Sequence, residues 1–413
     1  MTRFRPSDHS SKLEITGIKS DLLAGKKIVI GMTGSVAVLE IVHLTRLLMR
    51  NGAEIYVAMS AAAMDLIQPD LVEWAVGNPV ITKLTGQIEH VHLCGKHPDK
   101  ADLLLIAPST ANTIGKIANG IDDTVVTTFA TTAFGTGIPI AIVPAMHATM
   151  YDNPMVVENI KKLKKNGVRF IGPRKEEGKA KIAKNEEILQ EIIGMLTPDD
   201  LAKKKVLVTA GPTRIWLDEV RFISNPSTGK MGINLALEAA SRGAEVTLLL
   251  GPTSLEVPST DIYTIHIETP QDIINSINKI KAIDIFISAA AIGDYQPEKQ
   301  KGKIPSKQKT LSLELKQTPK IIDYVKEKFP KARIVGFKAE VDVTKDELEK
   351  RAQKSLMEHK IDMVVANYLD KTEQGFASET NEVIIVQKSK KSIEVPLKLK
   401  RQISKKILDE LLS

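Results

Sequence analysis

Two histidines stand two residues apart in the segment IEHVHL (88–93). An imidazole ionises near neutral pH, so one of them could act as a general base. On a strand, His90 and His92 would share a face and could suit a metal, whereas on a helix they would point to different faces. The acidic residue beside them is Glu89. A metal site is therefore the weaker interpretation, and the spacing by itself favours a histidine at the surface or at a helix cap over a general base.

The segment RFISNPSTGKMG (221–232) contains the Gly-Lys pair of a phosphate-binding loop but lacks the rest of that motif. Ser224 stands in place of the first glycine, and Met231 in place of the Ser or Thr that should follow Lys230. The residues from Ser227 to Gly229 are expected to offer hydroxyl and N–H groups at the start of a helix. Lys230 fits a surface lysine as well as it fits a phosphate contact.

A third candidate is the segment SAAAIGDYQP (288–297). Its three alanines would let a flat group approach the backbone closely. Asp294 could accept a hydrogen bond from an amino group or a ribose hydroxyl, or hold a metal. The lysines of the following segment, 298–320, each fit a solvated loop, but together they would suit a triphosphate.

These residues belong to a pattern that occurs twice along the chain. Residues 25–60 read as a strand, a glycine-containing loop, a helix and a second strand, and residues 203–254 repeat that order. A glycine follows each helix, at Gly52 and Gly243, where a left-handed C-cap is expected. Apolar strands that alternate with helices indicate parallel sheets covered on both faces. The predicted fold is α/β, with two doubly wound, Rossmann-like domains.

Ligands of such sheets bind beyond the carboxyl ends of the strands. In the first half, IGMTGSVAV (30–38), Ser60 and APSTAN (107–112) lie at such ends. The first loop lacks the G-x-G-x-x-G dinucleotide fingerprint, so one phosphate with several hydroxyl partners favours a mononucleotide. In the second half, the loop of VLVTAGPTR (206–214) is also placed to meet a phosphate.

The composition restricts the classes of function. The chain has 413 residues, a net charge of +7, one cysteine (Cys94) and 4% aromatic residues. Two domains, anionic substrates and a reducing cytoplasm are expected. Neither nucleic acid nor a membrane is an expected partner, because aromatic platforms, a long apolar span and a signal peptide are not evident in the sequence. The rival enzyme class, a two-domain NAD(P) oxidoreductase, would need a dinucleotide fingerprint that neither glycine loop provides.

Residues 26–195 resemble a known family. The segments GSVAV, VAMSAAA, HVHL, ADLLLIAPSTANTIGKIANGIDD and VPAMHATMYDNP occur in the order found in flavin-dependent cysteine decarboxylases such as phosphopantothenoylcysteine decarboxylase. The resemblance implies a flavodoxin-like fold, FMN as cofactor and His90 as the catalytic histidine. It also implies FMN-binding and substrate-binding residues: Gly34, Ser35, Val36, Ser60, Ser109, Thr110 and Asn112 for FMN, and Met146, His147, Lys179 and Lys181 for the substrate.

The chain departs from this family at two places. His147 occupies the position of the asparagine in Pro-Ala-Met-Asn, where a protonated imidazole would pair with a substrate carboxylate. The substrate flap of many bacterial members contains Ala-Cys-Gly, but residues 175–187 contain no cysteine. Lys179, Lys181 or a water is therefore expected to donate the proton in the reductive step.

Residues 204–410 resemble phosphopantothenate–cysteine ligase. The segments TAGPTR, LDEVRFISNPSTGKMG, AAAIGDYQP, KGKI, LELKQTPKII, VGFKAE and DMVVANYL carry this resemblance. It implies an acyl-cytidylate made from CTP, with Mg²⁺ as cofactor. It implies Asn225 and Lys303 as catalytic residues, with Asn225 stabilising a developing oxyanion. The implied nucleotide pocket is Gly211, Ser288, Ala289, Ala290, Asp294, Lys303, Pro319, Lys320, Ile321, Ile322 and Phe337, with Asp294 as the candidate Mg²⁺ ligand.

Here, too, the chain departs from the family pattern. Ile215 and Trp216 stand where Glu-Pro is usual, and the two late lysines of the family fall at Ser355 and His359. The preference for CTP over ATP is therefore left open by the sequence.

The two families are fused in this order in many prokaryotes, which implies a bifunctional enzyme of coenzyme A synthesis. The expected division is an extension (1–22), a decarboxylase domain (23–196), a linker (197–203) and a ligase domain (204–413). The resemblance also implies a homo-oligomer, with trimeric flavin halves and dimeric ligase halves that can build a dodecamer. The expected substrates are 4'-phosphopantothenate, cysteine and CTP.

Overall fold

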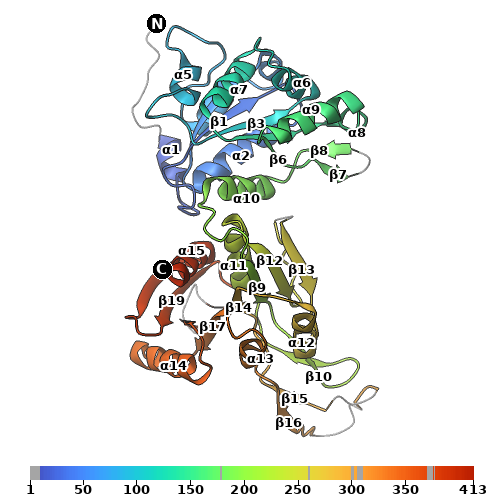
Figure 1. The fold of residues 1–413 in the computed structure, drawn as a ribbon, viewed down its shortest axis with the longest axis vertical. Coiled ribbons are helices and arrows are strands. Elements are labelled where there is room, and N and C mark those ends of the chain that lie inside the picture. The colour runs from blue at the N-terminus through green and yellow to red at the C-terminus, as the bar shows by residue number, and fades with distance from the viewer. Residues whose placement is uncertain are drawn as a thin grey trace. The chain divides into compact units, whose positions relative to one another are not determined.

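The computed structural model describes residues 10–176, 179–258, 261–298, 302–304, 310–369, 375 and 377–413. The chain divides into two compact units, Met1–Thr197 and Pro198–Ser413. Each unit is an α/β domain with its own sheet (Figure 1). In the described part of the chain, no helix combines the length and the apolar character needed to cross a bilayer.

The first unit is built on a parallel sheet with the order β2-β1-β3-β4-β6. This is the flavodoxin-like strand order, so the predicted fold of this half is confirmed. The strands are β1 (Lys27–Met32), β2 (Glu54–Met59), β3 (Leu103–Ser109), β4 (Ile140–Pro144) and β6 (Arg169–Phe170). A second, three-stranded sheet contains β5 (Met146–His147), β8 (Lys179–Lys181) and β7 (Arg174–Glu176), all antiparallel.

Helices cover both faces of this sheet because successive side chains of each strand point to opposite faces. Ile28 and Ile30 of β1 pack in one core, while Val29 packs in the other. The first face is covered by α1 (Ser10–Ile15), α2 (Val38–Arg50), α4 (Pro69–Val76) and α10 (Asn185–Leu196). The second is covered by α5 (Glu89–Cys94), α6 (Ala111–Ala118), α7 (Val125–Thr136) and α9 (Pro154–Lys165). Two single-turn helices, α3 (Ala61–Met64) and α8 (Ala148–Tyr151), follow β2 and β5.

The second unit has an eight-stranded sheet with the order β13-β12-β9-β14-β17-β18-β19-β20. The first six strands are parallel in the Rossmann order, which confirms the doubly wound prediction, and the last two are antiparallel. The strands are β9 (Lys205–Ala210), β12 (Glu245–Leu250), β13 (Ile262–His266), β14 (Ile285–Ser288), β17 (Arg333–Glu340), β18 (Met363–Tyr368), β19 (Thr380–Gln387) and β20 (Ile393–Leu399).

Among the described residues, two helices cover one face of this sheet and three cover the other. The pair α11 (Lys230–Ser241) and α15 (Lys400–Leu412) lies side by side (Figure 1). The opposite face carries α12 (Pro270–Lys279), α13 (Ile321–Lys328) and α14 (Lys345–Glu358). The unit also contains a short hairpin, β10 (Arg214–Trp216) with β11 (Phe222–Ser224), and a short antiparallel strand pair, β15 (Tyr295–Pro297) with β16 (Leu315–Gln317).

The predicted glycine caps are confirmed at both repeats. Gly52 follows α2 with φ of 98°, and Gly243 follows α11 with φ of 82°. A side chain at such φ values meets steric strain, so glycine lets the chain leave the helix and enter the next strand.

Candidate active sites

In the first unit, the order of strands reverses between β1 and β3, and the loops after these strands lie together. The Thr33 hydroxyl joins them, because it donates to Pro108 O at 2.8 Å and accepts from Thr110 N at 3.2 Å. The predicted FMN residues of both loops, including Gly34, Ser35, Ser109 and Thr110, therefore lie at one edge of the sheet. This switch point is where a flavodoxin-like sheet binds its ligand.

Three predicted FMN residues differ in how their hydroxyl groups are used. Ser60 and Thr110 are N-caps, accepting from the backbone of Ala63 and Thr113, each at 3.3 Å. The Ser109 hydroxyl is fully buried and has no hydrogen-bond partner among the described residues. A buried polar atom without a partner is costly, so Ser109 is suited to a bound group that supplies one. Val36 (77% exposed) and Asn112 are open to solvent at the same edge.

A cavity of about 610 Å³ lies in this unit. It is lined by Ser35, Val36, Met146, His147 and Lys181. The pairing of β5 with β8 places Met146 opposite Ala180, and His147 opposite Lys179. The side chain of Lys179 lies outside what the structure describes. The cavity is therefore formed where the Pro-Ala-Met-His segment meets the flap strand.

Arg174 also lines this cavity and did not emerge from the sequence. It lies opposite Lys181 in the pairing of β7 with β8, and its Nε donates to Ile182 O at 3.0 Å. The sequence contains no signal for it beyond a basic residue next to the flap. With Lys181 and His147 it gives the cavity groups able to bind a carboxylate or a phosphate.

His90 lies on helix α5, so the helical alternative for the two histidines is correct and their side chains leave different faces. Nδ1 of His90 is buried without a partner among the described residues, and its ring meets the edge of Phe129. His90 is not among the residues that line the cavity. His92 instead lies near Asp99, with 3.9 Å between Nε2 and Oδ2.

Cys94 is buried in the core between α5 and the sheet. Burial raises the pKa of its thiol to about 12, so the thiol is protonated at neutral pH. Cys94 does not line the cavity near the flap. It is a core residue of the first unit.

In the second unit, a cavity of about 430 Å³ lies beyond the carboxyl ends of β9 and β14, where the strand order reverses. Most residues of the predicted nucleotide pocket line it: Ser288, Ala289, Ala290, Asp294, Pro319, Lys320, Ile321, Ile322 and Phe337. Ser355 and His359, which replace the two late lysines, also line it. Gly211 and Lys303 do not.

Asn225 lines the same cavity, directly after strand β11. Its side-chain amide donates to Ala291 O at 3.2 Å, which holds it against the alanine segment. The Ser224 hydroxyl donates to Thr213 O at 2.9 Å and fixes the hairpin end to the loop after β9. An exposed amide held in this way can donate to a bound group at small reorganisation cost.

Asp294 forms an ion pair with Lys320, with 2.6 Å between Oδ1 and Nζ. The described residues contain no group of three or more His, Cys, Asp or Glu side chains able to hold a metal ion. A magnesium ion would therefore take most of its oxygen ligands from nucleotide phosphates and water, as is usual for this ion.

The Gly-Lys pair of residues 229–230 stands at the start of helix α11 and lines the cavity. Gly229 caps α11 with φ of 81°, and a Cβ on Gly232 would lie 2.5 Å from the Cβ of Ala210. Glycine thus allows α11 to pack closely on β9. Lys230 donates to Ala377 O at 2.7 Å and pairs with Glu379 at 2.5 Å. Lys230 lines the cavity and is held there by these two groups.

Lys400 is a second lining residue that did not emerge from the sequence. It is 3% exposed and donates to Gly375 O at 2.8 Å and to Ser378 O at 2.6 Å. Burial, together with the charge of Lys230, lowers its pKa to about 8, against the opposing effect of Glu379. In the sequence it is one lysine among several near a helix start, and only folding brings it to the cavity.

Comparison with known proteins relates both units to described families. Residues 16–197 match the family described as Flavoprotein, and residues 201–413 match the DNA/pantothenate metabolism flavoprotein C-terminal domain. A solved structure titled as the C-terminal domain of coenzyme A biosynthesis bifunctional protein CoaBC is 34% identical, with a TM-score of 0.42, and covers 52% of this chain and 96% of that chain.

Relatives that extend over nearly the whole chain share one name, coenzyme A biosynthesis bifunctional protein CoaBC. The protein of Thermococcus kodakarensis is 49% identical and covers 98% of this chain and 98% of its own length. That of Methanocaldococcus jannaschii is 37% identical, with 97% of each covered, and that of Bacillus subtilis is 34% identical, with 94% of this chain and 97% of its own length covered. The chain therefore belongs to the family of bifunctional coenzyme A biosynthesis proteins.

Proposed function

We propose that the second unit joins 4'-phosphopantothenate to cysteine and that the first unit decarboxylates the product. The observation that carries the ligase half is the cavity between β9 and β14, which gathers Asn225, the alanine segment, Asp294, Lys320 and Phe337. An aromatic ring, closely approachable backbone, an amide and a cation are the groups that a nucleotide needs.

The ligase reaction proceeds in two displacements. The carboxylate of 4'-phosphopantothenate attacks the α-phosphorus of CTP and releases pyrophosphate, forming an acyl-cytidylate. The cysteine amine then attacks the acyl carbon, and CMP leaves. Asn225 donates a hydrogen bond to the oxyanion that develops on the acyl group as the amine attacks it, and Lys303 offsets the charge of the departing pyrophosphate. Asp294 would be the protein ligand of a Mg²⁺ ion bound with the nucleotide, and the ion would offset the charge of the phosphates.

The decarboxylase half uses the cavity of the first unit that Met146 and His147 line. FMN, held by the residues at the ends of β1 and β3, supplies the chemistry of accepting and returning an electron pair. Met146 and His147 bind the substrate carboxylate, and His90 takes a proton as general base. The Ser109 hydroxyl, which is buried without a partner in the described structure, supports a bound group at this edge.

The proton for the final reductive step comes from Lys179, Lys181 or a water. Cys94 is unsuited to this role, because it is buried away from the flap cavity. If no such donor operates, the wild-type enzyme will release an oxidised enethiol product. Mass spectrometry of the product mixture therefore tests this part of the proposal.

A homo-oligomer is supported by the position of His90, which is not among the residues that line the cavity with His147. A second copy of the chain is the simplest means of bringing the two together in one site. Mixing His90→Asn and His147→Ala proteins under conditions that allow subunit exchange should then restore decarboxylation. Two active-site residues supplied by a single copy would leave the mixture inactive.

Two measurements on the wild-type protein test the function as a whole. Gently purified protein should show the visible absorption of an oxidised flavin, and a colourless protein would count against the first half. Pyrophosphate release from CTP should depend on 4'-phosphopantothenate and exceed release from ATP. Equal rates with the two nucleotides would refute the cytidine preference. The cytoplasm is the proposed location.

A further inference from the structure

Asp218 is a fully buried carboxylate that the ligase chemistry above does not use. It lies in the turn between β10 and β11, seven residues before Asn225. One carboxylate oxygen, Oδ1, accepts from Val220 N at 2.7 Å and from Arg221 N at 2.6 Å. These two hydrogen bonds stabilise the turn between the strands.

The other carboxylate oxygen reaches a segment 86 residues away in the sequence. Oδ2 accepts from Ile304 N at 2.9 Å, and this bond is the largest cause of the lowered pKa of Asp218. A second hydrogen bond joins the same two segments, from Glu219 N to Gly302 O at 3.3 Å. The residues on both sides of Lys303 are thus bonded to one turn.

The burial of the flanking residue agrees with a fixed segment. Ile304 is 5% exposed, whereas Lys303 between the two bonds is exposed. The backbone of Lys303 is therefore held while its side chain is free to meet a solvent-borne anion. A buried acceptor needs a hydrogen-bond partner, and Ile304 N is the backbone donor to Oδ2 of Asp218. The burial of Asp218 therefore favours this contact.

We propose that Asp218 is a positioning residue that fixes the backbone of Lys303 for the ligase reaction. The proposal rests on the phosphate role of Lys303 given above. It explains how the hairpin that ends in Asn225 and the segment that carries Lys303 keep one geometry, since a single carboxylate bonds to both. A misplacement of about 1 Å in a catalytic group can cost on the order of 100-fold in rate.

The substitution Asp218→Asn separates the two functions of the carboxylate. The amide oxygen can keep the bonds to Val220 and Arg221, but the amide nitrogen is a donor and faces the N–H of Ile304. The bond from Ile304 N is lost, together with the charge that faces the Arg221 guanidinium at 3.8 Å, whereas the bond from Glu219 N to Gly302 O is not removed. Asp272 offers a matched control, since its carboxylate accepts from Glu268 N at 3.1 Å and Thr269 N at 2.8 Å in the same unit but away from the cavity.

Pyrophosphate release with CTP and 4'-phosphopantothenate measures the effect. Asp218→Asn should lower kcat by on the order of 10- to 100-fold, with the KM for CTP changed by less than about threefold. In a Lys303→Ala background the same substitution should change kcat by less than about twofold, because its effect acts through Lys303. Asp272→Asn should leave kcat within about twofold of the wild-type value.

Equal effects of Asp218→Asn in both backgrounds would overturn the proposal, as would a wild-type kcat in Asp218→Asn. A wild-type protein without pyrophosphate release would instead refute the ligase function. One further measurement uses the wild-type protein alone, so its result depends neither on the kinetic outcomes above nor on how the Asp218→Asn variant folds. Amide hydrogen exchange at Ile304 should be protected at least about 100-fold, and exchange at the free-peptide rate would show that the bond from Ile304 to Asp218 does not form.

Discussion

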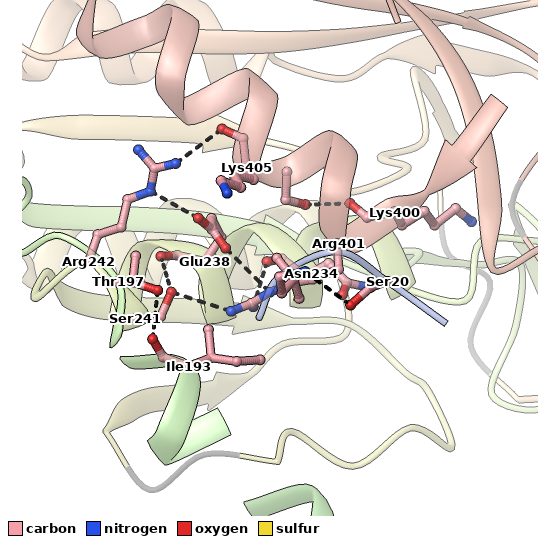
Figure 2. Close-up of polar contacts among 12 residues, drawn as sticks. Ser20, Ile193, Thr197, Asn234, Glu238, Ser241, Arg242, Lys400, Arg401 and Lys405 are labelled. Carbon is pink, nitrogen blue, oxygen red and sulfur yellow. Dashed lines mark hydrogen bonds and ion pairs between the residues drawn. The ribbon is translucent and has the colours of Figure 1, made fainter. Parts of the chain in front are cut away.

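A buried ion cluster joins helices α11 and α15 in the second unit (Figure 2). Glu238 is 1% exposed and lies between two guanidinium groups. Its Oε1 is 2.9 Å from Arg242 Nε, and its Oε2 is 3.3 Å from Arg401 Nε. Arg242 also pairs with Asp200 and Asp409. Among the described residues, the acidic partner of Arg401 is Glu238.

Glu238→Gln should therefore leave Arg401 as a buried charge without an anion. The other contacts of Arg401 are neutral oxygens, Asn234 O and the Ser241 hydroxyl, both at 3.3 Å. Burial lowers the pKa of Arg401 only to about 10, so the side chain stays charged at pH 7. Breaking one partner of a buried pair costs about 3–5 kcal/mol. For a unit of this size, that corresponds to a fall in Tm of about 6–20 °C.

Differential scanning calorimetry of the full chain measures this fall. Glu358→Gln is the matched control, because Glu358 and Lys354 form an exposed pair at the same helical spacing, 3.6 Å apart. Its effect should stay below about 1 kcal/mol. Adding Arg401→Met to Glu238→Gln should recover most of the lost stability, since the unpaired charge is then gone. A shift in Glu238→Gln no larger than that of the control would refute the reasoning.

Three further predictions concern pKa values and the separation of the two activities. Since the folded-state pKa of Lys400 is about 8, below the usual value of about 10.4, the folded state loses this proton first as pH rises. Between about pH 8 and 10.4, the free energy of unfolding of the wild-type protein should thus rise relative to that of Lys400→Met, by at most about 1.4 kcal/mol per pH unit. Urea titrations of both proteins measure this difference, and a difference that does not change with pH would contradict the lowered pKa of Lys400. Cys94 should react with a thiol reagent at pH 8 only on unfolding, and rapid labelling of the native protein would contradict its burial. His90→Asn should abolish decarboxylation and Asn225→Asp should abolish ligation, each measured with its own substrate; loss of both activities in either variant would indicate misfolding rather than a specific role.

The sequence by itself determined the doubly wound, parallel part of both units, but not the antiparallel strands β19 and β20 or the small sheet of β5, β8 and β7. Apolar strands that alternate with amphipathic helices must be covered on both faces, because each strand directs side chains to two sides. The glycines at 52 and 243 marked the helix ends, since their conformation disfavours other residues. Segments such as APSTAN and SNPSTGKMG, taken in their order along the chain, were enough to recognise the family that each half resembles. They stand at the strand ends, where ligands of such sheets bind.

Only the tertiary structure decided which residues share a cavity. Lys400 and Arg174 carry no local signal, and the chain must fold before distant elements bring them to a site. The helical placement of His90 also followed from packing, since a six-residue segment fits a strand or a helix equally well. Asp218 reads as an ordinary turn residue in the sequence. Its importance appears only when two segments 86 residues apart meet, because a hydrogen bond depends on distance in space and not on separation along the chain.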